Sequence, residues 1–243
     1  MSMQYKKIAF LAPLPGLPDE AFRRYWREIH GPLVAGSPGY SAYRQRYVQN
    51  HVLTPGPVGD EFAFAGMAEF WLPGDNEDEF AWTSIYRDRI RPDEMKFIDM
   101  QGTISMSALE QVPKPGSGPV KIVVLSGRAA GVSSESFRAR FAADFVEAAL
   151  GETAFAGHLR GWRVDHVVEG SFRLPGARPV SALPIDSIQS FWFNSDEDMQ
   201  AAFAHLKASR RLRAVSDSIF SSASWRSFKA DERVFFDQGR ALV

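Results

Sequence analysis

The sequence predicts an α+β chain that contains one β-α-β-β-α-β unit twice, and three observations support this class. A run rich in proline and glycine, residues 112–119, lies near the midpoint of the 243 residues. A short apolar run typical of a buried strand opens each flanking stretch, at residues 7–11 and again at 121–125. A helix-opening pattern that places a phenylalanine before an arginine then follows in both, at 17–23 and 132–138.

Each unit continues in the same order after its first strand. Pro18 suits the first turn of a helix over residues 19–30, and Ser133 or Ser134 can cap the corresponding helix of the second unit. The first unit then has a strand over residues 40–53. Two further strands complete each unit, at 69–72 and 103–109 in the first and at 190–193 and 225–230 in the second.

This order is that of the ferredoxin-like split βαβ motif, whose four-stranded antiparallel sheet carries helices on one face only. The other face is bare and needs a partner. We therefore expect two ferredoxin-like domains, 1–112 and 120–243, joined by a linker over 113–119. Their sheets are expected to pack face to face as a dimeric α/β barrel within one chain. An insertion at 169–184, which contains three prolines, predicts a surface loop or lid.

Composition excludes several kinds of function. A formal net charge of -1 argues against a dedicated nucleic-acid binder, and no stretch is apolar for long enough to span a membrane. No secretory signal is visible at the start of the chain, so we expect a cytoplasmic protein. The chain has no cysteine, which removes disulfides and thiol chemistry. The 19 phenylalanines predict helix–sheet cores and the lining of an apolar pocket.

The first helix carries the first candidate catalytic residue. At about 100° per residue, Phe22 and Trp26 share an apolar face, and His30 lies at the edge of that face. His30 can therefore point into the interface between helix and sheet. It precedes Gly31-Pro32, which predicts a helix end or kink beside it. A packed, hydrogen-bonded structural histidine is an equal alternative.

The strand predicted over residues 40–53 carries the second candidate. Alternation places Tyr43, Gln45, Tyr47, Gln49 and His51 on one face. Two phenols, two amides and an imidazole suit a cleft that binds an oxygenated ring. The alternative is an edge strand with solvated polar side chains.

His30 and His51 are accordingly the predicted catalytic pair, because a histidine is the natural general acid or base near neutral pH. Tyr43 and Tyr47 are expected to bind substrate by donating to a developing enolate or phenolate. Trp26 and Phe22 are expected to line the same pocket and stack on an aromatic substrate. The spacing of these histidines matches no recognised metal-ligand motif, and the sequence has no Gly-rich phosphate-binding loop, so no metal and no cofactor are predicted.

Four blocks of the first half resemble the EthD-domain family. Residues 17–33 contain the phenylalanine, arginine and aromatic pattern that ends in His30-Gly-Pro. The blocks Tyr47-Val-Gln-Asn-His51, Ala68-Glu-Phe-Trp71 and Pro92-Asp-Glu-Met-Lys-Phe-Ile-Asp99 are similar to the blocks that follow in that family. The resemblance implies a dimeric α/β barrel, and it matches His30 and His51 to positions used for proton transfer or substrate contact.

The second half resembles the same domain in a degenerate form. Phe145 aligns with His30, His166 aligns with His51, and the Asp-Glu-x-x-Phe block becomes residues 216–220. We therefore expect one working site in the first half and a mainly structural second half.

Three functions remain open from the sequence. The first is a cofactor-independent lyase or isomerase that acts on an oxygenated aromatic, lactone or polyketide-like molecule, by dehydration, decarboxylation or proton transfer, as in the breakdown of aromatic compounds. The second is a cofactor-independent monooxygenase of quinol-like substrates, with Trp26, Trp71 and Trp82 as pocket aromatics. The third is a non-catalytic binding or assembly protein. A small molecule is the expected partner in the first two, and the fused pair of domains could form a homodimer.

Overall fold

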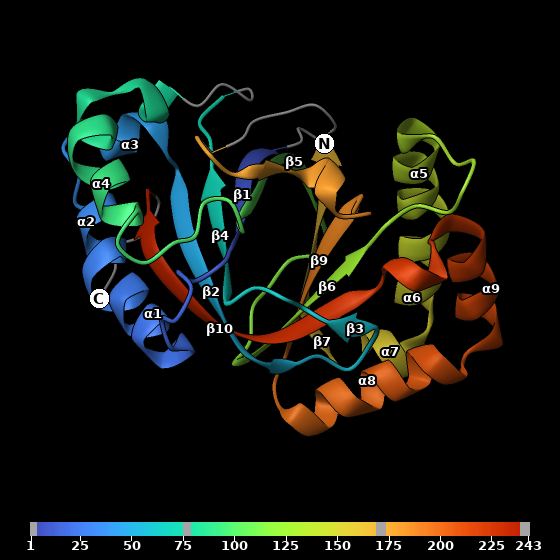
Figure 1. The fold of residues 1–243 in the computed structure, drawn as a ribbon. Helices are drawn as coiled ribbons and strands as arrows, with labels where there is room; N and C mark the ends of the chain where they lie inside the picture. The colour runs from blue at the N-terminus through green and yellow to red at the C-terminus, as the bar shows by residue number, and fades with distance from the viewer. Residues whose placement is uncertain (1–3, 75–78, 169–173, 239–243) are drawn as a thin grey trace.

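A closed, antiparallel β-barrel with helices on its outside forms the centre of the molecule (Figure 1). The computed structural model describes residues 4–74, 79–168 and 174–238. The helices of the first half lie on one side of the barrel and those of the second half on the other. The α+β class and the barrel predicted from the sequence are thus confirmed.

The described residues of the first half form five strands. They are β1 (Gln4–Leu11), β2 (Arg46–Pro55), β3 (Asp60–Glu61), β4 (Gly66–Trp71) and β5 (Ile104–Lys114). The longer helical segments are α1 (Asp19–Tyr25), η1 (Trp26–His30), α2 (Gly31–Ala35), α3 (Tyr40–Tyr43), η2 (Glu79–Trp82), η3 (Tyr86–Ile90) and α4 (Arg91–Glu94).

The second half repeats the order of the long strands. Its strands are β6 (Val120–Ser126), β7 (Leu159–Val168), β8 (Arg178–Pro179), β9 (Ser187–Phe193) and β10 (Arg226–Asp237). Its helical segments are α5 (Ser134–Arg140), η4 (Phe141–Val146), α6 (Glu147–Gly151), α7 (Thr153–Ala156), η5 (Val180–Ala182), α8 (Asp196–Ala208), α9 (Arg210–Ile219) and η6 (Ser222–Ser224).

The two sheets join at their edges. Within the first half the order is β5-β1-β4-β2, and within the second it is β10-β6-β9-β7. Antiparallel pairing of β2 with β10 and of β5 with β7 then closes the ring. The faces that the sequence predicted to pack against each other therefore become the inner wall of one continuous sheet. Closure leaves none of these eight strands with an unpaired edge, which removes a liability of open sheets.

The strand register corrects the repeat by one residue. The sequence pattern aligned Lys7 with Lys121, but Lys6 is the residue that pairs with Trp71, as Lys121 pairs with Trp192. Each of these lysines also lies over the tryptophan ring opposite it, at 4.0 Å for Lys6 and 4.7 Å for Lys121. Lys7 instead points to the outer face of β1, because successive side chains of a strand alternate between faces.

The buried apolar side chains of the described residues form three clusters. One lies between the sheet and the helices of each half, and the third fills the inside of the barrel. The interior cluster includes Phe10, Phe62 and Phe228, with the rings of Phe62 and Phe228 stacked 4.5 Å apart. The phenylalanine surplus therefore serves three cores, one more than the two helix–sheet cores that the sequence indicates.

A buried ionic network crosses the barrel beside this cluster. The Nζ of Lys6 lies 2.5 Å from Glu69 and 2.9 Å from Asp165, which come from opposite halves of the chain. Lys121 donates to Asn50 at 2.7 Å and lies 3.4 Å from Glu69. Burial would lower the pKa of Lys6, but the surrounding carboxylates raise it above its ordinary value, so Lys6 stays charged.

Asp165 is the carboxyl group of this network whose ionised form is disfavoured. Burial raises the pKa of its carboxyl, and the charges of Glu69 and Glu110 raise it further, although Lys6 opposes this. The Lys6 ammonium is therefore needed to compensate several carboxylates that are removed from water.

Local structure differs from the sequence predictions in three places. The helix predicted over 19–30 continues through Gly31-Pro32 to Ala35, since a wide π-helical turn occupies Trp26–His30. Residues Tyr40–Tyr43 form α3 rather than the start of a strand, and β2 begins at Arg46. The predicted linker begins inside β5, which extends to Lys114. Among the described residues, no helix combines the length and the apolar character needed to cross a membrane.

The ionic network makes a testable prediction about stability. Lys6→Met should lower the free energy of unfolding by about 3–5 kcal/mol, because it leaves buried carboxylates without their cation. The loss should be smaller at pH 5 than at pH 8, because Asp165 takes up a proton more readily than an ordinary aspartate. Urea unfolding at the two pH values measures both effects.

The matched control is Lys229→Met, which breaks an ion pair with Asp196 that is partly exposed. A change of about 1 kcal/mol or less is expected there. An equally small loss for Lys6→Met would contradict the role assigned to the network.

Candidate active site

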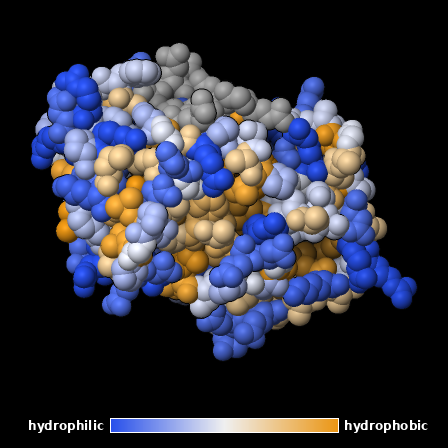
Figure 2. Space-filling model, in the orientation of Figure 1, coloured by the Kyte–Doolittle hydropathy of each residue, from blue (hydrophilic) through white to orange (hydrophobic). Residues whose placement is uncertain are grey.

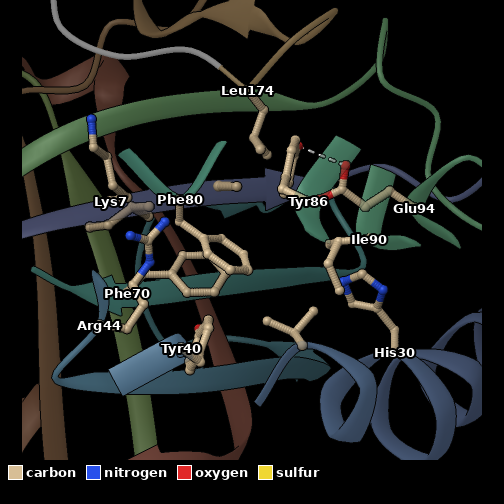
Figure 3. Close-up of a pocket in the computed structure, with 13 residues that line it drawn as sticks. Lys7, His30, Tyr40, Arg44, Phe70, Phe80, Tyr86, Ile90, Glu94 and Leu174 are labelled. Carbon is tan, nitrogen blue, oxygen red and sulfur yellow. Dashed lines mark hydrogen bonds between the residues drawn. The ribbon is translucent and has the colours of Figure 1, made fainter. Parts of the chain in front are cut away.

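A narrow cavity lies between the outer face of the first-half sheet and its helices (Figure 3). Its volume is only about 40 Å³. Its floor is formed by β1 and β4, and Tyr40, Phe70, Phe80 and Tyr86 contribute aromatic rings to its lining. A ring-sized ligand therefore enters only if lining side chains move. The lining residues are Lys7, Ile8, Ala9, His30, Val34, Tyr40, Arg44, Phe70, Phe80, Tyr86, Ile90, Glu94 and Leu174.

His30 reaches this cavity from the last residue of the π-helical turn, where it is 5% exposed. Its Nδ1 lies 2.9 Å from Asp93 Oδ2. Burial would raise the pKa of Asp93, but hydrogen bonds from His30, Tyr25 and Lys96 hold it below its ordinary value. An ionised carboxylate only accepts hydrogen bonds, so Nδ1 of His30 carries the hydrogen.

The hydrogen bond to Asp93 determines which nitrogen of the His30 imidazole can accept a proton. With the hydrogen on Nδ1, the neutral ring has its lone pair on Nε2, the nitrogen that acts as a base. Nε2 has no hydrogen-bond partner among the residues that the structure describes. Asp93 thus fixes the tautomer and orientation that a general base at the cavity wall requires.

Glu94 is a second ionisable group of the cavity. It is 6% exposed and accepts hydrogen bonds from the Tyr86 hydroxyl at 3.0 Å and from Arg91 at 3.1 Å. Burial raises the pKa of its carboxyl, although His30, Arg91 and Tyr86 act in the other direction. A carboxyl with a raised pKa near a base is suited to hold or return a proton.

Two buried cations occupy the other end. Lys7 is 2% exposed and Arg44 is 4% exposed. Figure 3 shows Lys7 and Arg44 on one side of the cavity, with Glu94 and His30 on the opposite side and Phe80 between them. The Arg44 guanidinium lies 5.5 Å from the Phe70 ring and 5.4 Å from the Phe80 ring. The cavity therefore has a basic imidazole at one end and positive charge at the other.

His30 and Asp93 both lie at or just after a π-helical turn that is followed by a proline. In each case, the π-helical turn is followed by a residue and then a proline: Trp26–His30 before Pro32, and Tyr86–Ile90 before Pro92. Proline has no N–H, so it cannot continue the ordinary helical hydrogen bonding at its position. The wide turn keeps both helices continuous there, and π-helical turns are frequent at functional sites.

His51 lies behind this turn and does not line the cavity. Its ring centroid is 4.5 Å from that of Trp26, and its Nε2 is 2.9 Å from Gln49 Oε1. Because an amide oxygen only accepts, His51 donates from Nε2. Gln49 in turn donates to the Trp26 carbonyl at 2.9 Å and to the Tyr47 oxygen at 2.8 Å. His51 is thereby connected to the turn that carries His30.

The other residues predicted to bind substrate also lie outside the cavity lining. Phe22 and Trp26 are buried in the helix–sheet core, with their rings 5.7 Å apart. Tyr47 is fully buried and stacks on Phe70 at 4.6 Å, so it supports one wall from behind. Tyr43 belongs to α3 and packs on Phe80 at 5.8 Å.

The second half lacks both members of the His30–Asp93 pair. Phe97 lies 5.0 Å from His30, and Phe220 lies 5.0 Å from Phe145, so Phe145 occupies the position equivalent to His30. In the same alignment Ser216 stands where Asp93 does. The base and the group that orients it are therefore missing together.

His166 keeps the environment of His51. Its Nε2 lies 2.9 Å from Gln111 Oε1, and its ring packs on Phe141. Burial lowers the pKa of both His51 and His166 to about 4, and nearby arginines add to this effect. Both are therefore neutral near pH 7.

The insertion predicted as a loop or lid contributes to the first-half cavity. Its residues 169–173 lie outside the described residues. Leu174, from the second half, lines the cavity and donates its backbone N–H to Ser105 at 2.7 Å. Further along, β8 pairs with the start of β5. The first-half cavity is thus partly closed by the second half.

Asp93, Glu94, Arg44 and Lys7 belong to the site but were not predicted as individual site residues from the sequence. Asp93 and Glu94 lie in a block that carried the family resemblance, and two adjacent carboxylates after Pro92 were the available signal. Nothing local marks Arg44 or Lys7, because their position depends on the packing of α3 and β1. Among the described residues, no group of three or more potential metal-ligating side chains is arranged to hold a metal ion.

Residues 14–101 match the model of the EthD domain family, the family that the first-half motifs resemble. No curated protein matches the sequence. Solved structures with the same fold include an anthrone oxidase-like protein (10% identity, TM-score 0.58, covering 100% of this chain and 98% of that chain). A candidate monooxygenase from Lactobacillus acidophilus NCFM is similar, with 10% identity, a TM-score of 0.56, and coverage of 98% of this chain and 97% of that chain. A mutant chlorite dismutase from Candidatus Nitrospira defluvii is also similar, with 13% identity, a TM-score of 0.51, and coverage of 95% of this chain and 93% of that chain.

The buried histidines predict an acid-sensitive stability. Because the pKa values of His51 and His166 in the folded chain are near 4, the unfolded chain binds more protons between about pH 4 and 6.5. Stability should therefore be full above pH 6.5 and fall by up to about 1.4 kcal/mol per pH unit for each histidine as the pH is lowered through this window.

Two measurements check this. Proton NMR should show two of the five histidines staying neutral down to about pH 4, and urea unfolding should give the stability profile. If all five histidines titrate near pH 6.5, the packing assigned to His51 and His166 is wrong.

Proposed function

We propose that the first half, residues 1–112, is the working half of an enzyme that removes a proton from a small oxygenated aromatic, lactone or polyketide-like molecule. The observation that carries this proposal is the His30–Asp93 hydrogen bond at the wall of an aromatic cavity. Lyase or isomerase chemistry is the proposed outcome. No step of it needs a cofactor or a metal ion.

In the proposed first step, Nε2 of His30 takes a proton from a C–H or O–H group of the substrate. Asp93 holds the Nδ1 hydrogen and stabilises the imidazolium that forms. Glu94, close to His30 and with a raised pKa, is the candidate for returning a proton to a different atom or to a leaving group. Transfer to another carbon gives isomerisation, and loss of a protonated hydroxyl gives dehydration.

The substrate anion that proton removal leaves is proposed to be stabilised at the end of the cavity opposite His30. Proton removal leaves negative charge that a conjugated ring system spreads onto its oxygen atoms. Arg44 is a buried cation at that end, so its guanidinium can face a developing oxyanion in a site from which water is largely excluded. Lys7 adds positive charge nearby, although Figure 3 shows its ammonium turned away from the aromatic rings. His51 and Tyr47 are proposed to position the turn and the wall rather than to contact substrate.

A monooxygenase is the second candidate function, and the names of two similar structures favour it. The same base could ionise a quinol, which then donates electrons to O₂ directly. In that reaction the quinol becomes a hydroxylated quinone, one oxygen atom enters the product and the other leaves as water. Both candidate functions therefore share the first step at His30.

We also infer that the chain arose by tandem duplication of a ferredoxin-like domain, with 120–243 as the degenerate copy after the connection at 113–119. The equal strand orders of the two halves and their paired Lys–Trp contacts support this. A homodimer of the fused pair remains a proposal that sedimentation analysis can test.

The catalytic assignment predicts the effect of removing each member of the dyad. Proton–deuterium exchange into a panel of quinols, lactones and hydroxylated aromatic acids, followed by NMR, reports the shared first step. His30→Ala should slow exchange by about 10³-fold, and Asp93→Asn by about 10²-fold or more, because general base catalysis depends on a correctly oriented imidazole.

His205→Ala is the matched control, since His205 contacts Glu152 at 3.0 Å in the second half, away from the first-half cavity. It should leave exchange unchanged. Unchanged exchange in His30→Ala, with the fold intact by circular dichroism, would remove the proposal. Formation of product in the absence of O₂ favours the lyase or isomerase, whereas consumption of one O₂ per substrate favours the monooxygenase.

The oxyanion role makes a separate prediction. Arg44→Met should lower kcat by about 10²-fold with little change in KM, because the charge is needed most in the transition state. Arg44→Lys keeps a cation and should recover part of the loss. If both variants behave alike, Arg44 acts through its packing on Phe70 and Phe80 and not through its charge.

A further inference from the structure

A second and larger cavity lies in the other half of the molecule, outside the proposed active site. It occupies the space between the outer face of the second-half sheet and the helices α8 and α9. Its volume is about 600 Å³. This volume is within the usual range for ligand pockets. Figure 2 shows apolar surface in the region where α8, α9 and β10 meet in Figure 1.

Four aromatic side chains contribute to its wall. Phe145, Phe191, Phe203 and Trp225 all line it, and Phe145 stands where His30 stands in the first half. Rings pack well against the faces and edges of other rings, so this wall favours a flat aromatic ligand. Without His30 and Asp93, the cavity has no equivalent of the proposed base.

One buried polar side chain interrupts the apolar wall. Gln189, on the outer face of β9, lines the cavity and is 1% exposed. Its Oε1 is buried and has no hydrogen-bond partner among the described residues. A buried amide left unsatisfied is costly, and native proteins leave few such groups without a partner. A hydroxyl group on a ligand can both donate and accept, so it fits either orientation of the amide.

The first half closes part of this cavity. Pro57, Val58 and Gly59 line it, and β3 pairs with the start of β10 beside them. Gly59 has φ of 73°, and a Cβ there would lie 2.2 Å from the Trp225 carbonyl oxygen, so the segment is fitted closely to its neighbour. Each half therefore contributes one segment to the cavity of the other, as Leu174 does for the first-half cavity.

From the volume, the aromatic wall and the unpartnered amide together, we propose that the second-half cavity is a non-catalytic binding site for a hydroxylated aromatic molecule of two or three fused rings, whose hydroxyl group hydrogen-bonds to Gln189. The proposal does not depend on the proposed reaction, because it involves no residue of the first-half cavity.

The test compares two probes of similar shape, 2-naphthol and 2-methylnaphthalene, by fluorescence titration of the full chain. The wild type should bind 2-naphthol about tenfold more tightly, since the methyl group leaves the amide unpaired. Gln189→Leu should abolish this preference while leaving binding of 2-methylnaphthalene equal or stronger. Leucine is close in shape to glutamine and removes no hydrogen bond that the side chain makes within the described residues.

Ser216→Trp, which blocks the cavity from α9, should abolish binding of both probes. Ala214→Trp is the matched control, because residue 214 is exposed on the same helix and does not line the cavity. An absence of binding at millimolar probe, a preference that survives Gln189→Leu, or binding that survives Ser216→Trp would each overturn the proposal.

Discussion

The pairing of sheet edges between the two halves is the constraint on which the other features depend. Each half alone would leave two edge strands unpaired and one sheet face bare. Pairing β2 with β10 and β5 with β7 satisfies all four edges and turns the bare faces into the inside of a barrel. That interior is filled by an apolar cluster and by the Lys6 network. The first-half and second-half cavities therefore lie on the outer faces of the sheet, under the helices.

Closure also explains why each cavity draws residues from both halves. The segments between β2 and β4 and between β7 and β9 extend from the strands that form the seams. One brings Val58 to the second-half cavity, and the other brings Leu174 to the first-half cavity. The two halves then differ in chemistry rather than in architecture. The first has an imidazole oriented by a carboxylate, and the second has phenylalanine and serine at those positions.

The sequence was sufficient for the order of the elements and for the faces of β2. Alternation correctly placed Tyr47, Gln49 and His51 on one face, and the helical pattern correctly brought His30 to the helix–sheet interface. The periodicity of a strand or helix in the sequence does not specify which other side chains pack on its faces. Trp26 covers His51, so the two predicted catalytic histidines do not share the cavity. The contact between His30 and Asp93 joins residues 63 positions apart, which no local pattern specifies. The strand register needed the structure as well, since it showed Lys6 rather than Lys7 to be the partner of Lys121.

The proposed role of His30 as a base depends on its tautomer, which nitrogen-15 NMR of histidine-labelled protein at pH 9 measures directly. His30 should carry its hydrogen on Nδ1, held by Asp93, with Nε2 unprotonated toward the cavity. His51 and His166 provide internal references, because both should carry the hydrogen on Nε2, where they donate to glutamine oxygens. A spectrum in which His30 shows the hydrogen on Nε2 would contradict its assignment as the base of the site.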